Sequence, residues 1–222
     1  MEFIILNNFY SFINCFSKTI CIWIFSSMIS IFFGTIIGFC LSRYYSNSFI
    51  KFILEKCILI LRGIPFYIQL SIFYFSISNY IYFLDSAIIS GVFSLGICSS
   101  AYTSIIVKTL INEFDILQWY SARILGYSKI NFFKNILFPQ VYYKFLCLMI
   151  NELDSILKST TILSTIGVLE LTRFGFNIIS KTMNPIPVYL FLALIYLILS
   201  ILLSYLMNYF SKKDKELGVL AI

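Results

Sequence analysis

Ionisable residues interrupt an otherwise apolar segment in the second half of the chain. Glu152, Asp154 and Lys158 lie within residues 141–168, and Asn151 precedes them. An ion at the centre of a bilayer costs about 2.5–3.5 kcal/mol on insertion scales, so a membrane-spanning segment of this kind must face protein or water. These residue types can give polar contacts to a solute or to a neighbouring helix.

Helical geometry separates the two carboxylates of this segment. Asp154 and Lys158 stand one turn apart and can neutralise each other. At about 100° per residue, Glu152 points roughly 200° away from Asp154, on the side that carries Ser155 and Ser159. One carboxylate is therefore left without a local partner. Two interpretations stay open: Glu152 packs or pairs with a neighbouring helix or chain, or it contacts a substrate.

A second polar cluster lies near the start of another apolar stretch. Arg62, Gly63 and Pro65 are followed by Gln69. Gly63 and Pro65 loosen the helical backbone at the level where Arg62 would anchor at the membrane interface, and Gln69 adds an amide one turn deeper. The cluster predicts a bent helix near a pathway. The alternative is an ordinary interfacial arginine.

The composition places these residues in a membrane protein. Of the 222 residues, 60% are hydrophobic and 12% are charged, and the mean hydropathy is +0.92. Soluble domains carry about 25% charged residues, so there is too little polar surface here to cover a globule. We therefore predict one all-α polytopic membrane domain that lies in the lipid bilayer.

Residue usage also argues against several chemistries. The chain has no histidine, which removes most zinc, haem and imidazole acid–base chemistry. The six cysteines show no C-x-x-C spacing, and we interpret them as small buried hydrophobic residues rather than disulfides or a metal site. The net charge of +6 is spread over short loops beside apolar runs, which argues against nucleic-acid binding. We expect no metal and no cofactor on this chain.

Apolar runs predict five transmembrane helices, at residues about 19–41, 57–84, 87–109, 141–168 and 188–210. With five spans, most of the 16 lysines and arginines fall on one side, which the positive-inside rule makes cytoplasmic. The N-terminal segment is then outside (periplasmic) and the C-terminal tail is cytoplasmic, at residues 1–15 and 211–222. Residues 171–187 are expected to form a mixed loop.

Small residues occur in the first and third predicted spans. Gly34 and Gly38 are four residues apart, and Gly96 precedes a run of small polar residues. Such residues permit close helix contact. The alternative is ordinary membrane glycine in the first span and a cavity wall in the third.

The longest polar interval, residues 113–140, predicts a helix–Gly–helix hairpin between spans three and four. Gly126 suits a left-handed turn after the first short helix, and Ser128 can cap the second. Pro139 either stops the second helix or lies in the first turn of the next. Because the interval falls on the basic side, we predict that the hairpin is cytoplasmic and contacts something outside the bilayer.

The hairpin sequence resembles that of a known membrane-protein family. It runs from Gln118 through Leu125-Gly126-Tyr127-Ser128 to Phe138-Pro139-Gln140. It is similar to the motif Gln-x-Glu-Ala-Ala, Leu-Gly-x-Ser and Leu-Pro-Gln of the membrane subunit of bacterial binding-protein-dependent ABC importers, the polar amino acid permeases. Over about residues 16–210, four more stretches fit in order: Arg62–Pro65 with Gln69, Ala101-Tyr102, Asn151–Thr160 and Ile166–Leu171.

The resemblance implies roles for individual residues. Tyr120 and Ser121 stand where the family has Glu and the first Ala, which bears on the strength or identity of the ATPase contact. The residues implied in coupling to an ATPase are Gln118, Tyr120, Ser121, Ala122, Leu125, Gly126, Ser128 and Pro139. Those expected along a substrate pathway are Glu152, Ser155, Ser159, Gln69, Tyr102 and Asn151, and those expected to be structural are Arg62, Gly63, Pro65, Asp154 and Lys158.

The resemblance also implies a mechanism of alternating access in the bacterial cytoplasmic (inner) membrane. Two permease subunits, identical or homologous, would enclose a pathway, and two cytoplasmic ATPase subunits with ATP and magnesium would dock on the hairpins. An extracytoplasmic solute-binding protein would deliver an amino acid. The chain has no G-x-x-x-x-G-K-S/T loop, so ATP would be hydrolysed elsewhere and the chain is not an enzyme.

The substrate class follows from one residue as a hypothesis. If Glu152 lines the pathway, its unpaired carboxylate favours a cationic amino acid. A secondary transporter or channel for a small polar solute is the alternative, and inverted internal repeats, which would favour it, are not seen. A membrane-embedded enzyme would need a compact catalytic cluster, which the scattered acids do not provide.

Overall fold

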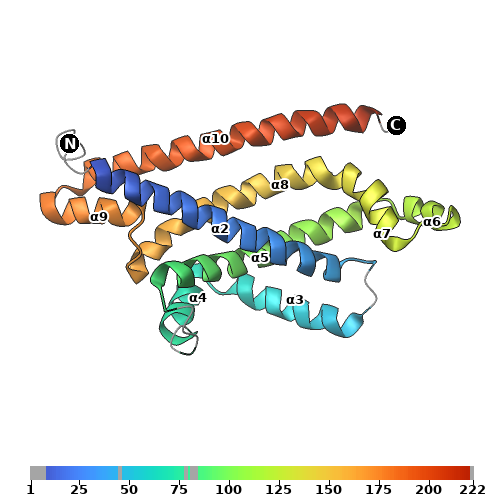
Figure 1. Ribbon diagram of the computed structural model, residues 1–222, viewed down its shortest axis with the longest axis horizontal. Coiled ribbons are helices and arrows are strands. Elements are labelled where there is room, and N and C mark those ends of the chain that lie inside the picture. The colour runs from blue at the N-terminus through green and yellow to red at the C-terminus, as the bar shows by residue number, and fades with distance from the viewer. Residues whose placement is uncertain (1–8, 45–46, 78–79, 81–84, 221–222) are drawn as a thin grey trace.

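The computed structural model describes residues 9–44, 47–77, 80 and 85–220, and every regular element in these ranges is a helix (Figure 1). The all-α class is therefore confirmed for the described part of the chain. η1 and η4 are π-helical turns, and η5 is a 3₁₀ helix. In chain order the elements are α2 (Phe9–Leu41), α3 (Ser48–Gly63), α4 (Phe66–Ile72), η1 (Phe73–Ile77), α5 (Ala87–Glu113), α6 (Ile116–Ile124), α7 (Lys129–Phe132), η4 (Phe133–Leu137), α8 (Phe138–Ser159), η5 (Thr160–Ile166), α9 (Leu171–Thr182) and α10 (Pro185–Leu220).

Three of the described helices, α2, α5 and α10, are long and apolar enough to cross a membrane. The number rises to five if each of two bent pairs counts as one span. One pair joins α3 to α4 and η1 with a bend of 105°, and the other joins the run from α7 to η5 to α9 with a bend of 49°. The five predicted spans correspond to this upper number.

α2 is longer than the first predicted span, because it begins at Phe9 rather than near residue 19. Residues 9–15 of the predicted N-terminal segment are therefore helical, and residues 1–8 lie outside the described residues. Cys15 and Cys98 are buried, but Cys21 and Cys57 are exposed, so the interpretation of all the cysteines as buried is wrong for these two.

α3 and α10 also extend beyond the predicted spans. α3 begins at Ser48 in the predicted basic loop, where the side-chain oxygen of Asn47 accepts hydrogen bonds from the first backbone N–H groups of the helix. The end of the second predicted span, residues 78–79 and 81–84, lies outside the described residues. α10 continues to Leu220, so most of the predicted tail is helical.

Residues 171–187, predicted as a mixed loop, contain the helix α9, and that prediction is wrong. Glu170 caps this helix, since its carboxylate accepts hydrogen bonds from the backbone N–H groups of Thr172 and Arg173, both at 2.8 Å. The charges of Arg173 and Lys181 obscure a short amphipathic pattern in the sequence. The buried side of α9 packs against α2 and α10 and consists of Leu171, Phe174, Gly175 and Ile178.

The bend between α3 and α4 has a chemical cause. Pro65 has no N–H, so the carbonyl of Leu61, four residues earlier, lacks its usual helical donor. The side-chain amide of Gln69 replaces that donor: its Nε2 lies 2.7 Å from the oxygen of Leu61 and 2.6 Å from that of Ile64. The thiol of Cys98 on α5 donates to Gln69 Oε1 at 2.8 Å. The predicted bent helix is confirmed.

α2 packs tightly along α5 (Figure 1). A Cβ at Gly34 would lie 2.4 Å from the Cβ of Thr103, and one at Gly96 would lie 2.6 Å from the Cγ2 of Ile29. Ser30 and Thr103 share a hydrogen bond of 2.8 Å across this contact. The glycines therefore serve close helix contact, the first of the two interpretations above.

Candidate functional site

A cavity of about 130 Å³ lies where α8, α5 and the α3–α4 bend meet. α8 contributes Glu152, Ser155 and Ser159, whose positions fall within about 60° of one another around the helix. The remaining lining residues come from the bend and from α5: Leu61, Ile64, Phe66, Gln69, Leu95, Cys98, Ser99 and Tyr102. The structure thus brings together five of the six residues predicted along a pathway.

Asn151 is the sixth, and it does not line this cavity. It lies one turn before Ser155 on α8, on the hairpin side, and it is exposed. Gln69 lines the cavity, but both of its functional groups are engaged, the amide nitrogen with backbone carbonyls and the oxygen with Cys98. Gln69 therefore shapes the wall of the cavity and has little capacity left for a solute.

Among the described residues, Glu152 is the one carboxylate that lines the cavity. Within the same residues it has no hydrogen-bond or ion-pair partner, whereas the helical geometry predicts only that it lacks a local one. Arg62 lies over the ring of Tyr102, with 5.1 Å between the guanidinium carbon and the ring centroid. Tyr102 in turn lines the cavity, so a cation lies beside the wall while an unpaired carboxylate faces the interior.

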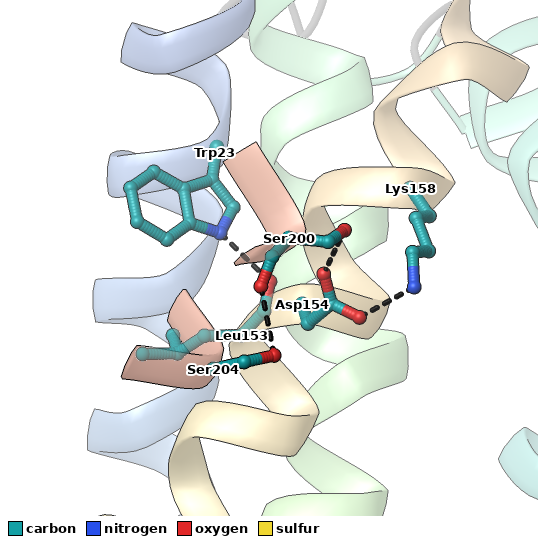
Figure 2. Close-up of polar contacts among 6 residues, drawn as sticks. All are labelled: Trp23, Leu153, Asp154, Lys158, Ser200 and Ser204. Atoms are coloured by element: carbon teal, nitrogen blue, oxygen red, sulfur yellow. Dashed lines mark hydrogen bonds and ion pairs between the residues drawn. The ribbon is translucent and has the colours of Figure 1, made fainter. Parts of the chain in front are cut away.

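Asp154 and Lys158 form the predicted pair on the other side of α8, with 2.5 Å between Nζ and Oδ2 (Figure 2). Ser200 on α10 donates a second hydrogen bond to Asp154, at 2.6 Å. On α2, the indole nitrogen of Trp23 donates to the carbonyl oxygen of Leu153 at 2.8 Å. α8 is therefore attached to α2 and α10 directly beside the cavity-facing Glu152.

Ser200 and Trp23 were not identified from the sequence. Each contacts α8 across a long sequence separation, so no local pattern indicates it. Glu170 was noted as part of a motif and not as a site residue. Its side chain is fully buried, it caps α9, and the hydroxyl of Tyr196 donates to it at 3.4 Å. An acid directly before a helical apolar pattern was the available signal.

The interval from residue 113 to 140 forms two helical arms joined by a tight turn. Asp115 caps α6 by accepting from the backbone N–H of residue 117 at 2.9 Å, and Ser128 caps α7 by accepting from that of residue 131 at 3.2 Å. Gly126 has φ = +82°, the left-handed conformation that glycine adopts without steric cost. The two local predictions for Gly126 and Ser128 are confirmed.

The second arm does not end at Pro139, although the sequence also allowed that alternative. Pro139 lies in the first turn of α8, directly after the π-helical turn η4, so the helical run passes through the proline and does not end there. The arm from Lys129 continues through η4 into α8, so the hairpin and the cavity-lining helix are one uninterrupted run that ends at Ser159.

Most of the residues predicted to couple to an ATPase are exposed: Gln118, Tyr120, Ser121, Leu125, Gly126, Ser128 and Pro139. Ala122 differs, because it is buried in the cluster that holds the two arms together around Phe132 and Trp119. Gln118 accepts a hydrogen bond from the amide of Gln140 at 3.1 Å, which ties the first arm to α8.

Large apolar side chains are exposed along the same hairpin. Ile124 exposes 86% of its surface, and the others in this set, which we call the apolar crest, are Leu117, Tyr120, Leu125 and Ile130. Contiguous exposed apolar residues on such an element mark a contact surface.

Within the described residues, no group of three Cys, Asp or Glu side chains could hold a metal ion.

Comparison with known proteins decides the family. The family model for the inner membrane component of binding-protein-dependent transport systems matches residues 30–215. The chain belongs to this family. It is therefore a permease subunit of an ABC importer, and such subunits are not themselves enzymes.

Relatives of this permease have named substrates. A putative glutamine transport system permease of Rickettsia typhi is 30% identical over 189 residues, which cover 84% of this chain and 87% of the relative. The arginine transport system permease of Bacillus subtilis is 28% identical over 191 residues, which cover 85% of this chain and 87% of the relative. These relatives and the apolar helices support the predicted membrane location and amino acid transport class.

Two solved structures have the same fold as this permease. A crystal structure of an amino acid ABC transporter with histidines gives a TM-score of 0.82 at 28% identity and covers 94% of this chain and 96% of that chain. The MetNI methionine ABC transporter, in an inward-facing conformation, gives a TM-score of 0.78 at 14% identity and covers 93% of this chain and 97% of that chain. At this identity the likeness supports the fold alone.

Proposed function

We propose that this permease moves a cationic amino acid across the cytoplasmic membrane by alternating access, driven by separate ATPase subunits. The substrate class rests on one observation, the unpaired carboxylate of Glu152 in the cavity. A carboxylate at low dielectric attracts a guanidinium or ammonium group strongly. Arg62, beside Tyr102 at the cavity wall, is suitably placed to attract the carboxylate that every amino acid carries.

The cavity is too small to be a complete binding site. Ligand pockets usually have volumes of about 300–1,000 Å³, whereas this one has about 130 Å³. A second permease subunit, identical or homologous, would supply the opposite wall. An extracytoplasmic solute-binding protein would deliver the amino acid to this pathway.

The apolar crest is the proposed docking surface for the ATPase, which would bind ATP and magnesium. Tyr120, at the position of the family's Glu, lines a cavity of about 300 Å³ together with Arg43. The side of the hairpin beside Arg43 is therefore apolar and cationic. A matching ATPase surface would carry apolar side chains and at least one acid.

The orientation is part of the proposal. With the hairpin on the cytoplasmic side, the short basic loops and the C-terminus are cytoplasmic and the N-terminus is outside, in accord with the positive-inside rule. Cysteine labelling from the two sides of sealed vesicles tests this arrangement. The test variant is Ile124→Cys, in the hairpin. Labelling of this variant only from the periplasmic side of the membrane would contradict the proposed orientation.

Uptake by proteoliposomes that contain the permease, its ATPase and its binding protein tests the function. Glu152→Gln removes a charge-assisted contact of about 1.5–3 kcal/mol, so arginine uptake should fall about 10- to 100-fold. Glu55→Gln is the matched control, because Glu55 is paired with Lys108 at 3.0 Å away from the cavity.

Two results would overturn the proposal. Unchanged arginine uptake by Glu152→Gln, with glutamine equally well transported, would remove the cationic substrate. Uptake that continues without ATPase or nucleotide would instead support a channel or secondary transporter.

A further inference from the structure

A deep apolar groove lies on a part of the molecule that the proposed pathway does not use. Its volume is about 590 Å³, and its wall is almost entirely apolar. α2, α5 and the run from α7 into α8 form its sides. Its lining residues are Thr35, Phe39, Val107, Leu110, Ile111, Lys129, Ile130, Phe133, Lys134, Leu137, Phe138, Val141, Tyr142 and Phe145.

The groove and the cavity around Glu152 use different levels of α5. Residues 95–102 of this helix line the cavity, whereas Val107, Leu110 and Ile111 line the groove. Both hollows are also lined by the run that contains α8. α2 completes the groove, whereas the α3–α4 bend completes the cavity. The groove is therefore separate from the cavity that a second permease subunit would close.

Polarity in the groove changes with depth. Lys129 and Lys134 occupy the first turns of the second hairpin arm, and neither forms an ion pair within the described residues. From Lys134 the lining continues along the helix to Phe145, roughly 16 Å deeper at a rise of 1.5 Å per residue. No acidic side chain is among the described lining residues. Two cations at one end of a long apolar groove match a phosphate attached to an acyl chain.

We propose that this groove binds an anionic phospholipid, with its phosphate near Lys129 and Lys134 and one acyl chain along α2, α5 and α8. Basic pockets between transmembrane helices bind anionic lipid head groups. The lipid comes from the leaflet on the hairpin side, which is the cytoplasmic leaflet if the proposed orientation holds. A lipid in this position contacts both α2 and the second hairpin arm, so it would restrain the movement of the hairpin.

Native mass spectrometry of the full-length permease in detergent tests the inference. The protein is titrated with phosphatidylglycerol and, separately, with phosphatidylcholine of the same acyl chains. Each cation contributes about fivefold, so the double variant Lys129→Gln with Lys134→Gln should bind phosphatidylglycerol about 10- to 30-fold more weakly. The control, Lys56→Gln with Lys144→Gln, removes the same charge outside the groove and should bind like the wild type.

A second variant tests the apolar part. Thr35→Trp fills the groove from α2 and should lower the binding of both lipids without changing the head-group preference. Equal binding of the two lipids by the wild-type protein, or an equal loss in the groove and control variants, would overturn the proposal. The proposal would also be overturned if Thr35→Trp abolished dimerisation of the permease and left lipid binding unchanged, since the groove would then be a contact between subunits. The titration measures no transport, so its failure leaves the proposed function standing.

Discussion

Replacing Gln69 by leucine is expected to destabilise the bend between α3 and α4. The Gln69 amide donates to the carbonyls of Leu61 and Ile64 at 2.7 and 2.6 Å, and Pro65 leaves the first of these without a helical donor. Losing both bonds leaves the part-buried carbonyl of Leu61 and the exposed carbonyl of Ile64 without this donor. Membrane double-mutant cycles give about 0.6 kcal/mol per bond, and a fully unsatisfied buried group costs about 1–3 kcal/mol. The expected loss is about 1 kcal/mol if neither carbonyl is stranded and about 4 kcal/mol if that of Leu61 is.

The measurement is thermal unfolding of the purified permease in detergent. At roughly 2–4 °C per kcal/mol for a chain of this size, Gln69→Leu should lower the Tm by several degrees. Ser71→Ala is the matched control on the same helix. Its hydroxyl donates to the carbonyl of Tyr67 at 2.9 Å, and that carbonyl lies within the helix. The control should therefore change the Tm by less than about 2 °C.

A second substitution separates the bend from the hydrogen bonds. Adding Pro65→Ala to Gln69→Leu returns a backbone N–H that can reach the carbonyl of Leu61 if the helix straightens. The double variant should regain stability and lose uptake, because a straight helix removes one wall of the cavity. A Tm for Gln69→Leu equal to that of the wild type would refute this account of the bend.

Three further outcomes are expected. Gly34→Leu places a side chain where a Cβ alone would lie 2.4 Å from that of Thr103, so the Tm should fall by more than in Gln69→Leu. Glu170→Ala removes the cap of α9 and should speed limited proteolysis there, reflecting a loss of about 1–2 kcal/mol; an unchanged rate would show that the cap is dispensable. Ile124→Ser should reduce co-purification of the ATPase, whereas Ile186→Ser should not, because Ile186 is an exposed residue at the start of α10 and that end of the helix lies far from α6 (Figure 1); equal retention would rule out the apolar crest as the docking surface.

Local chemistry made part of the site predictable. The angular separation of Glu152 from Asp154 follows from helix geometry alone, and the structure has the same separation. The left-handed turn at Gly126 follows from the residue type in the same way. The predicted bend, in contrast, was attributed to both Gly63 and Pro65. A Cβ at Gly63 would meet nothing within 4 Å, so the proline and not the glycine explains the bend.

Contacts between distant segments were not predictable from one sequence. Trp23 is 130 residues from Leu153, and Ser200 is 46 residues from Asp154, so neither pairing leaves a periodic signal. A local signal for α9 is present in the sequence: Leu171, Phe174 and Ile178 recur at helical spacing directly after Glu170, an acid that can cap a helix. The prediction of a loop overlooks this pattern in favour of the charges of Arg173 and Lys181.

The attachments of α8 determine how a movement of the hairpin would reach the pathway. The run from Lys129 to Ser159 has no break, although the π-helical turn η4 lies within it, so its two ends are mechanically connected. Trp23 and Ser200 hold this run at residues 153 and 154 (Figure 2). In the proposed cycle a displacement of the hairpin would become a rotation about that level, and we expect the neighbouring Glu152 to move least. In the proposed cycle the carboxylate stays in place while the segments on either side of it open in turn, which keeps the solute contact fixed while access alternates. Removing the fixed point by Trp23→Phe should lower the uptake obtained per ATP hydrolysed and leave the binding of the ATPase unchanged; an unchanged ratio would show that α8 does not pivot there.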